Sequence, residues 1–280
     1  MSVPISETLF SLAGKTALLT GSAGFLGQHM ARALLRYGAD VILLGRSGRI
    51  FEQREQLATE FGSDAVRAHQ VDMYDLEQYE ALLRQIERDE KPIDVLVNNA
   101  FDFSERTGFN SPVGRFDVST YDQWLSCFIS GVWWAALSTQ IIGGQMKLRR
   151  TGSIVNISTM YAVVAPDPAL YEDTTYFNPP GYPAAKAGLL SLTRYTASFF
   201  GPSQVRANAI LPGPFSNIGG DTYNSVKQDD PFIERLKAKT ALKRTGRAWE
   251  LEGALIFLAS EASSFVTGQS IVVDGGWTIT

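Results

Sequence analysis

Apolar segments of strand length alternate with amphipathic segments of helix length along almost the whole chain. The expected strands lie at 16–20, 41–44, 66–71, 93–98, 153–158, 205–211 and 269–273. The expected helices lie at 24–37, 51–61, 76–88, 121–140, 183–200 and 250–258. Because strands of this kind are apolar on both faces, they suit a parallel sheet that helices cover on both sides. With right-handed crossovers, the alternation predicts a doubly wound α/β fold that binds ligands beyond the carboxyl ends of its strands.

The length of 280 residues fits one large α/β domain or two small ones. No internal repeat or low-complexity linker divides the chain, so we expect a single domain over 1–280. Three long segments, at about 101–119, 160–181 and 213–239, fit neither a strand nor a helix. Long loops in compact domains are more often functional than incidental, and each of these follows an expected strand. We therefore expect the three loops to form the substrate site.

Composition excludes several classes of function. The formal net charge of −4 argues against nucleic acid or an anionic membrane as the main partner. Cys127 is the only cysteine and His29 and His69 are the only histidines, so an intrachain disulfide is excluded and no metal site is expected. The N-terminus lacks a signal-peptide pattern, and no apolar run approaches the ~20 residues of a membrane helix. We expect a soluble, cytoplasmic protein with a small-molecule substrate.

A glycine-rich turn follows the first expected strand and opens the first expected helix. Its glycines are Gly21, Gly24 and Gly27, and the residues between and beside them include Ser22, Phe25 and Leu26. Glycines permit a tight turn and close approach of the backbone to a pyrophosphate, while the helix N-terminus offers free N–H groups. Such a turn alone is often only a turn. In this strand-before, helix-after context it predicts dinucleotide binding.

The residue at the end of the second expected strand indicates which dinucleotide is bound. An acidic residue is usual there for NAD, whereas an arginine accommodates the 2′-phosphate of NADP. This chain has Arg46, and no acidic residue follows until Glu52; Arg49 is a second candidate cation. The pattern favours NADP(H). If Arg46 is only a solvated surface residue, NAD(H) stays open as the cofactor.

Tyr182 and Lys186 stand four residues apart at the start of an expected helix. Positions i and i+4 share a helix face, so the ammonium lies near the phenol. A nearby cation lowers the pKa of a phenol, which ordinarily is about 10, and so makes tyrosine usable as a general acid or base. Most isolated pairs of this spacing are surface residues, so the meaning of this one depends on its neighbours.

Those neighbours resemble the short-chain dehydrogenase/reductase family, in its single-domain branch, over nearly the whole chain. Besides the glycine turn and the Tyr–Lys pair, the matching motifs are Asp72, Asn98-Asn99-Ala100, Asn156-Ile157-Ser158-Thr159, Arg206-Ala207-Asn208-Ala209-Ile210 with Pro212-Gly213, Thr267-Gly268-Gln269 and Val273-Asp274-Gly275-Gly276. The resemblance implies a Rossmann-like, three-layer α/β/α fold.

The resemblance also implies roles for individual residues. Tyr182 exchanges the proton of the substrate oxygen, and Lys186 lowers the pKa of Tyr182 and binds the nicotinamide ribose. A hydroxyl after the fifth strand, from Thr159 or alternatively Ser158, holds the substrate oxygen. The other implied cofactor contacts are Asp72 and Met73 for the adenine, Asn99 and Ala100 for the adenosine ribose, and Pro212, Gly213 and Phe215 for the nicotinamide.

The chain departs from the family pattern in four places. The glycine spacing resembles the extended branch of epimerases and dehydratases. Thr159 stands where serine is usual, and Phe128 aligns with a helix asparagine that supports a proton relay; Phe128 is otherwise explained as core packing. Thr159 and Tyr182 are 23 residues apart, more than is usual. The aromatic residues of this insert, together with Phe101 and Phe103, predict an aromatic wall around the substrate, or else a segment that merely packs.

The leading hypothesis is an NADP(H)-dependent oxidoreductase that interconverts a secondary alcohol and a ketone, with a sugar, polyol or sugar derivative as substrate. A catalytically silent cofactor-binding sensor or scaffold is one alternative. An NAD(P)-retaining sugar epimerase or dehydratase is another. Family members assemble as dimers or tetramers through the helices that carry Phe128 and Tyr182, so we expect a homo-oligomer. The adjacent Trp133 and Trp134 cannot both face the same core, which predicts one of them at a subunit interface.

Overall fold

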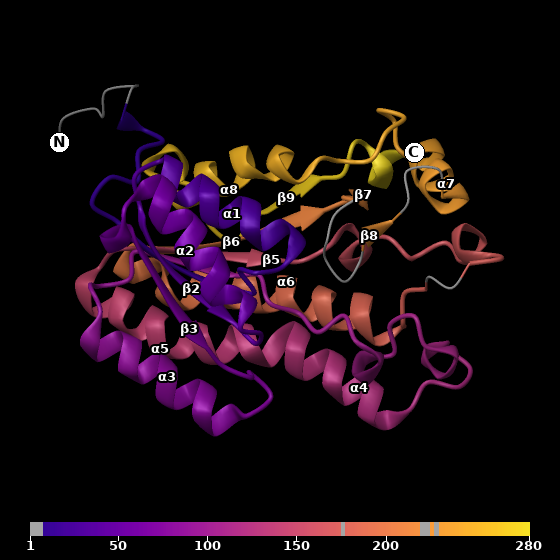
Figure 1. Cartoon of the computed structure of the whole chain (residues 1–280), viewed down its shortest axis with the longest axis horizontal. Coiled ribbons are helices and arrows are strands. Elements are labelled where there is room, and N and C mark those ends of the chain that lie inside the picture. Colours follow the sequence, from indigo (N-terminus) through magenta and orange to yellow (C-terminus); the bar gives the residue numbers. More distant parts are fainter. Residues whose placement is uncertain (1–7, 175–176, 219–224, 227–229) are drawn as a thin grey trace.

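Seven parallel strands form one sheet at the centre of the computed structural model, which describes residues 8–174, 177–218, 225–226 and 230–280 (Figure 1). In spatial order the strands are β3 (Val66–Gln70), β2 (Asp40–Gly45), β1 (Thr16–Thr20), β4 (Val95–Asn98), β5 (Gly152–Ile157), β6 (Val205–Pro212) and β9 (Ser270–Val273). The order reverses direction beside β1, so a crevice opens between the segments that follow β1 and β4. The predicted doubly wound sheet is confirmed.

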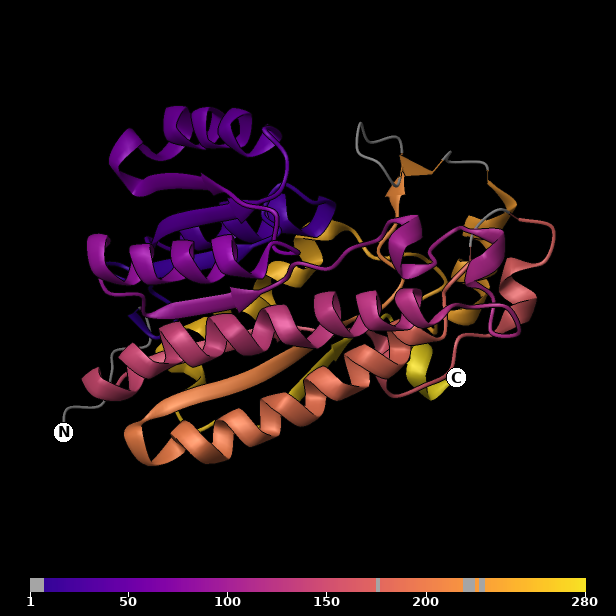
Figure 2. The same cartoon turned by 90° about the horizontal axis from the view of Figure 1, so that it is seen from below.

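Helices cover both faces of the sheet. Their bounds are α1 (Phe25–Arg36), α2 (Arg49–Phe61), α3 (Leu76–Asp89), α4 (Tyr121–Phe128), α5 (Trp134–Arg149), α6 (Gly181–Phe200), α7 (Pro231–Lys239) and α8 (Glu252–Ala259). One core joins α1, α2 and α8 to the sheet, and the other joins α3, α5 and α6 to its opposite face (Figures 1 and 2). All five side chains of β1 are buried, because they lie between these two layers.

Local signals place several element ends where they were expected. Asp75 caps α3, with its carboxylate accepting a hydrogen bond from the backbone N–H of Gln78 at 3.0 Å. Gly38 follows α1 with φ +95°, a conformation in which glycine carries no Cβ penalty. Pairing of β1 with β2 runs from Thr16 opposite Asp40 to Thr20 opposite Leu44. The glycine turn and Arg46 therefore emerge side by side from neighbouring strands.

The expected helix at 121–140 is longer than predicted. It continues to Arg149 and contains a π-helical turn at Ile129–Trp133 between α4 and α5. By length and composition alone, the stretch Tyr121–Arg149 is apolar enough to cross a membrane, and 56% of its most apolar window is buried inside the fold. Its residues Leu137, Ile141 and Met146 pack against the sheet, which explains the apolar composition as core packing.

The segment 213–239 was expected to be a loop, and this expectation was wrong for its end. α7 occupies Pro231–Lys239, with the Asp230 side chain accepting from the N–H of Phe232 at 2.9 Å. Asp followed by Pro is a helix-start signal that the polar composition of the segment obscured. The helix buries Ile233 and Leu236. Short strands β7 (Asn217–Ile218) and β8 (Ser225–Val226) precede it.

The three long segments after β4, β5 and β6 meet at the carboxyl edge of the sheet (Figure 2). They share one apolar cluster, which includes Phe109 from the first segment, Met160 and Tyr161 from the second, and Ile233 from the third. Tyr182 belongs to the same cluster. The fold thus brings a candidate catalytic side chain and all three expected substrate loops together.

Candidate active site

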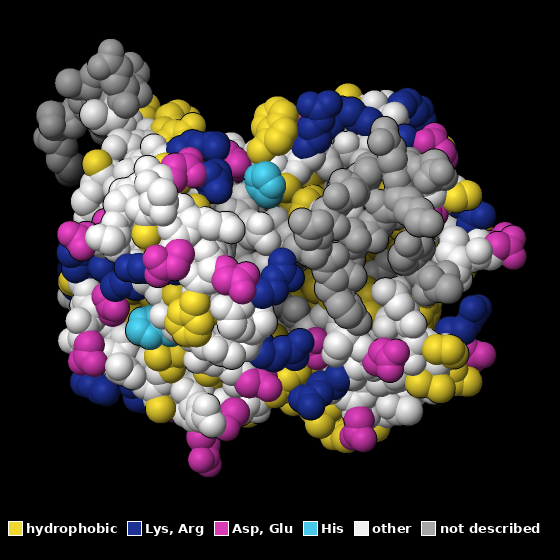
Figure 3. Space-filling view, in the orientation of Figure 1, with side chains coloured by type: hydrophobic (Ala, Val, Ile, Leu, Met, Phe, Trp, Pro, Cys, Tyr) yellow, Lys and Arg dark blue, Asp and Glu magenta, His cyan; other side chains and the backbone are white. Residues whose placement is uncertain are grey.

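A cavity of about 730 Å³ lies along this edge, between the glycine turn and the three long segments. The surface is hollowed there, with basic side chains on the rim beside hydrophobic ones (Figure 3). The predicted cofactor residues that line it are Gly21, Gly24, Phe25, Leu26, Gly27, Arg46, Asp72, Met73, Asn99, Ala100, Tyr182, Lys186, Pro212, Gly213 and Phe215. Both candidate hydroxyl residues, Ser158 and Thr159, also line it.

Ser22 was predicted to bind the cofactor, but the structure buries it beneath the turn. Its side chain is fully buried, its N–H donates to the Leu44 carbonyl at 3.2 Å, and its carbonyl accepts from Gln53 Nε2 at 3.0 Å. Ser22 therefore anchors the turn to β2 and α2 and does not reach the cavity. The sequence motif shows only that the residue belongs to the turn, because the motif carries no information on which way a side chain points.

Two glycines of the turn have no room for a side chain. A Cβ on Gly21, which has φ +66°, would lie 2.8 Å from the Ala100 Cα. A Cβ on Gly27 would lie 2.3 Å from the Gly21 carbonyl oxygen. Gly24 precedes α1 and has no side chain to cap it, so the first N–H groups of the helix stay available to a ligand. This cradle fits a phosphate group, which helix N-termini bind through N–H groups and the helix dipole.

Asn99 holds the turn from the side of β4. Its Nδ2 donates to the carbonyls of Thr20 and Gly21, at 3.1 and 3.0 Å. The Thr20 hydroxyl in turn accepts from the N–H groups of Asn99 and Ala100, at 3.0 and 3.1 Å. Asn99 thus reaches the expected cofactor indirectly, by fixing the shape of the glycine turn.

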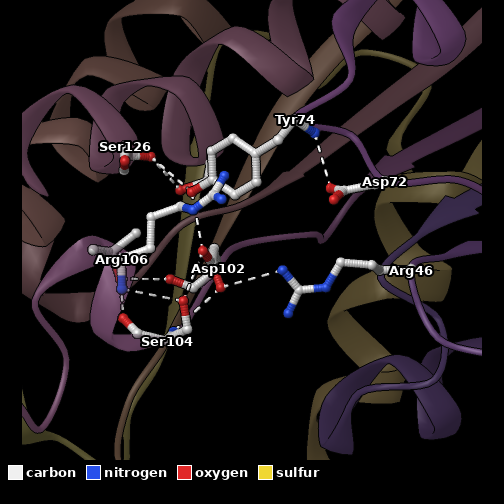
Figure 4. Close-up of polar contacts among 9 residues, drawn as sticks. Arg46, Asp72, Tyr74, Asp102, Ser104, Arg106 and Ser126 are labelled. Atoms are coloured by element: carbon white, nitrogen blue, oxygen red, sulfur yellow. Dashed lines mark hydrogen bonds and ion pairs between the residues drawn. The ribbon is translucent and has the colours of Figure 1, made fainter. Parts of the chain in front are cut away.

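Arg46 extends from the end of β2 toward the loop that follows β4. Its Nη1 lies 3.8 Å from Oδ1 of Asp102, whose side chain is only 2% exposed (Figure 4). Asp102 was not among the predicted site residues, because a single aspartate in a long loop carries no motif. The ion pair joins segments that leave the sheet on either side of β1.

The end of the cavity beside β3 presents polar groups suited to a nucleobase. Asp72 is exposed there, with its Oδ1 held by the N–H of Tyr74 at 3.1 Å. Trp134 lines the same cavity, and its buried Nε1 has no hydrogen-bond partner among the described residues. The exposed Asp72 carboxylate beside the glycine cradle fits a dinucleotide carrying an adenine.

Tyr182 begins the first turn of α6 and is 8% exposed. Burial raises the pKa of its phenol to about 12, contrary to the expectation that Lys186 lowers it, and a hydrogen bond from the Thr159 side chain acts against that rise. Thr159 is the second residue after β5, and its Oγ1 also accepts the N–H of Tyr161 at 3.3 Å. The phenol and the Thr159 hydroxyl are therefore adjacent donors that can bind one substrate oxygen.

Lys186 lies one helical turn further along α6 and is 3% exposed. Its Nζ donates to the Ile157 carbonyl at 2.8 Å and lies 5.1 Å from the centre of the Phe101 ring. Burial lowers the pKa of Lys186 to about 7. The same depth that excludes water from the Tyr182 phenol thus brings the ammonium into the neutral pH range, where it can exchange a proton.

Aromatic rings enclose Tyr182. The ring centres of Phe101, Phe103 and Phe109 lie 4.9, 5.8 and 5.1 Å from that of Tyr182. The predicted aromatic wall is thus present for Phe101 and Phe103, whereas Phe109 was missed. Phe109 stands eight residues further along the same loop, a position that only the folding of the loop reveals.

The second long segment adds polar groups to the aromatic ones. The hydroxyls of Tyr161 and Tyr171 lie 3.0 Å apart, and Asn178 Nδ2 donates to the Tyr171 hydroxyl. Tyr161, Tyr171 and Asn178 all line the cavity. Tyr176 belongs to the same predicted wall and lies outside the described residues. α7 contributes Phe232 and Leu236 to the cavity, and neither residue was predicted from the sequence.

Phe128 does not take a place in the core, contrary to the packing interpretation. It ends α4 and is 42% exposed. The buried side chain of that turn is Cys127, whose Sγ would lie 2.9 Å from a Cβ on Gly181, beside Tyr182. The π-helical turn then presents Gly131 to Phe101. Of the two adjacent tryptophans, Trp133 is 42% exposed and Trp134 is buried, so Trp133 is the one available to a subunit interface.

Comparison with known proteins extends over the whole fold. A family model described as enoyl-(acyl carrier protein) reductase matches residues 21–278. Gluconate 5-dehydrogenase of Gluconobacter oxydans is 32% identical over 274 residues, which cover 97% of each chain. The 5-keto-D-gluconate 5-reductase of Escherichia coli K12 is 32% identical over 275 residues, covering 97% of this chain and 98% of the relative.

Solved structures share the same architecture. A gluconate 5-dehydrogenase from Burkholderia cenocepacia, in complex with NADP and tartrate, matches with a TM-score of 0.82 and 28% identity, covering 99% of this chain and all of the other. The NADPH-dependent 3-quinuclidinone reductase of Rhodotorula rubra matches with a TM-score of 0.81 and 26% identity, covering 100% and 97%. Both are similar to this chain along its full length.

Proposed function

The chain belongs to the short-chain dehydrogenase/reductase family, and the relatives described above are oxidoreductases that act on CH–OH groups. We propose that it interconverts a ketone and a secondary alcohol on a sugar acid or polyol, with NADP(H) as cofactor. The observation that carries the proposal is the meeting of Tyr182, Thr159 and Lys186 with the glycine turn in one cavity. A proton donor and a dinucleotide cradle in one cavity suit hydride transfer to a carbonyl carbon.

The cofactor is held by groups already described. The glycine turn would hold the pyrophosphate, Arg46 would bind the 2′-phosphate, and Asp72 would lie beside the adenine. The bound nicotinamide supplies or accepts the hydride. NADP-containing and NADPH-dependent structures among the similar proteins support this choice of cofactor.

The proton path uses residues of this chain alone. In reduction, the Tyr182 phenol donates its proton to the substrate oxygen, and the Thr159 hydroxyl donates a hydrogen bond to the same oxygen. In oxidation, Tyr182 takes the hydroxyl proton back. Lys186, when protonated, favours the ionised phenol and so makes that return feasible. The aromatic enclosure keeps competing water away from the phenol.

The substrate class rests on the cavity wall and on the relatives. The hydroxyls of Tyr161 and Tyr171 and the amide of Asn178 are suited to bind polyol oxygens, while Phe101 and Phe103 offer faces to C–H groups. Relatives named for gluconate and 5-keto-D-gluconate support a sugar acid. This side chain set favours a hydroxylated substrate over a purely aliphatic ketone.

The test is NADPH consumption with 5-keto-D-gluconate and L-sorbose, and NADP reduction with D-gluconate, against an aliphatic ketone as control. We expect turnover on the hydroxylated substrates, reduced about 10²- to 10⁴-fold in Tyr182→Phe. Equal turnover by that variant would refute the role of Tyr182. Tight NADPH binding without turnover on the panel would favour a silent cofactor-binding protein, and cofactor that copurifies stoichiometrically would favour an epimerase or dehydratase.

We further propose a homodimer or homotetramer formed through the face of α4, α5 and α6. Phe128 and Trp133 are each 42% exposed on this helical layer, and Tyr195 and Phe199 are more exposed still. Light scattering tests this, and a monomer would refute it.

We also propose a cytoplasmic location, since a single, buried cysteine suits a reducing compartment. Cell fractionation tests that proposal.

A further inference from the structure

Asp102 is a buried carboxylate fixed by three donors of its own segment and of the segment after β3. The Tyr74 hydroxyl donates to its Oδ2 at 3.0 Å, the Ser104 hydroxyl donates to Oδ2 at 2.9 Å, and the Ser104 N–H donates to Oδ1 at 3.2 Å (Figure 4). The Thr107 hydroxyl further fixes the Asp102 backbone by donating to its carbonyl at 2.8 Å. A carboxylate held at this many points has one orientation.

The fixed Asp102 carboxylate forms an ion pair with Arg46. Its side chain is 59% exposed, and the ion pair of 3.8 Å with Asp102 Oδ1 is the contact that directs it toward the cavity. A guanidinium carries five N–H donors in a rigid plane. One edge turned toward Asp102 leaves other donors facing the cavity, where Arg46 and Asp102 both belong to the lining.

The local charge remains favourable to an anion. Arg106 places its guanidinium 4.2 Å from the centre of the Tyr74 ring, close to the same carboxylate, and Arg49 also lines the cavity. Against the negative charges of Asp102 and Asp72, three arginines are present in this region, so positive charge remains in excess. Asp102 can orient Arg46 without making the region repel a phosphate.

We propose that Asp102 is a positioning residue that holds the Arg46 guanidinium ready for the 2′-phosphate of NADP(H). An exposed arginine loses side-chain freedom when it binds a ligand, and fixing it beforehand lowers that entropic cost. The inference rests on the NADP(H) preference proposed above. It goes beyond that proposal because it assigns part of the cofactor choice to a loop after β4, outside the strand end that carries the arginine.

The sign of one substitution distinguishes positioning from simple competition. Asp102→Asn keeps the shape and removes the charge. If Asp102 positions Arg46, NADPH binding weakens by about threefold to fivefold, the range expected of an exposed ion pair, and NADH binding changes by less than about twofold. If Asp102 merely competes with the phosphate for Arg46, removing its charge tightens NADPH binding, which would overturn the proposal. Dissociation constants come from quenching of tryptophan fluorescence.

A double-mutant cycle ties the effect to Arg46. In an Arg46→Ala background, Asp102→Asn should no longer change NADPH affinity; an equal loss in both backgrounds would mean that Asp102 supports the loop only, and would overturn the proposal. Should Asp102→Asn fail to fold, Tyr74→Phe removes one anchor of the carboxylate and should give a smaller loss that likewise disappears without Arg46. If Tyr74→Phe still weakens NADPH binding in the Arg46→Ala background, the proposal is overturned.

The same titrations separate this proposal from its premise. Wild-type protein that binds NADH as tightly as NADPH would remove the NADP(H) preference, and the proposal with it. Wild-type preference for NADPH that Arg46→Ala abolishes, together with unchanged binding in Asp102→Asn, would leave the preference standing and overturn the role of Asp102 alone.

Discussion

The hydroxyl of Ser158 donates a hydrogen bond of 3.0 Å to the backbone carbonyl of Lys186. Two adjacent hydroxyl side chains at the end of β5 therefore have separate tasks. Ser158 ties β5 to α6, while Thr159 hydrogen-bonds the Tyr182 phenol. Alternation along an extended chain sends neighbouring side chains to opposite sides, so only one of the two can face the substrate.

Thr159→Ala should lower kcat by about 10²-fold, the scale of losing one donor to a developing oxyanion. Ser158→Ala should leave kcat within about threefold and lower the free energy of unfolding by about 1 kcal/mol, because the buried hydrogen bond to the Lys186 carbonyl is lost. Thr159→Ser should restore most of the activity. Steady-state kinetics and urea denaturation measure both effects, and the opposite ranking of the two alanine variants would reassign the substrate hydroxyl to Ser158.

Gly27→Ala should weaken NADPH binding by at least about tenfold, equivalent to 1.4 kcal/mol. The added Cβ would lie 2.3 Å from the Gly21 carbonyl and so must displace the turn. Gly144→Ala is the matched control, since a Cβ there meets no atom within 4 Å on α5. That control should bind NADPH normally and be more stable by about 0.5–1 kcal/mol. Unchanged NADPH binding in Gly27→Ala would remove the turn from the cofactor site.

Stability should rise with pH above 7 because of Lys186. Burial lowers the pKa of Lys186 to about 7, from an ordinary value of 10.5. Between these values the unfolded chain holds a proton that the folded chain has lost, so deprotonation favours folding as pH increases. The contribution has a slope of at most about 1.4 kcal/mol per pH unit.

The measurement compares urea denaturation of wild type and Lys186→Met from pH 6 to 9.5. The other shifted groups, such as Cys127, are common to both proteins and cancel in the difference. The stability of wild type relative to Lys186→Met should be flat below pH 7 and increase above it. Parallel stability curves across the whole range would contradict a lowered pKa for Lys186.

Phe101→Ala should lower the free energy of unfolding by about 2–3 kcal/mol, because its ring packs on Tyr182, Phe103 and Gly131 and leaves a cavity when removed. Phe103→Ala is the control. Because Phe103 is 40% exposed, this substitution should lower the free energy of unfolding by only about 1 kcal/mol. Water admitted beside Lys186 in Phe101→Ala should also raise the pKa of Lys186 toward its ordinary value. Equal stability losses in the two variants would show that Phe101 has no special place in the enclosure.

The sheet and the helices next to it follow from patterns within a few residues. Strand β1 lies at Thr16–Thr20, as expected, because five consecutive apolar or small residues can be buried on both faces of a sheet. Asp75 caps α3 and Tyr182 and Lys186 share the first turns of α6, since both relationships depend only on spacing along a helix. α7 was missed although Asp230 and Pro231 signal its start, because its surrounding segment is polar.

The sequence by itself determined the positions of the strands and helices, the glycine turn and the Tyr182–Lys186 pair. Each of these depends on the spacing of residues within a short stretch of chain. Only the tertiary structure decided which hydroxyl faces Tyr182, that Phe128 lies at the surface, and that Asp102 meets Arg46. Arg46 follows β2 and Asp102 follows β4, and these two strands lie on either side of β1, so their following segments come together at the same edge of the sheet. Such contacts depend on how separate loops pack over a common edge, and no pattern of neighbouring residues records that packing.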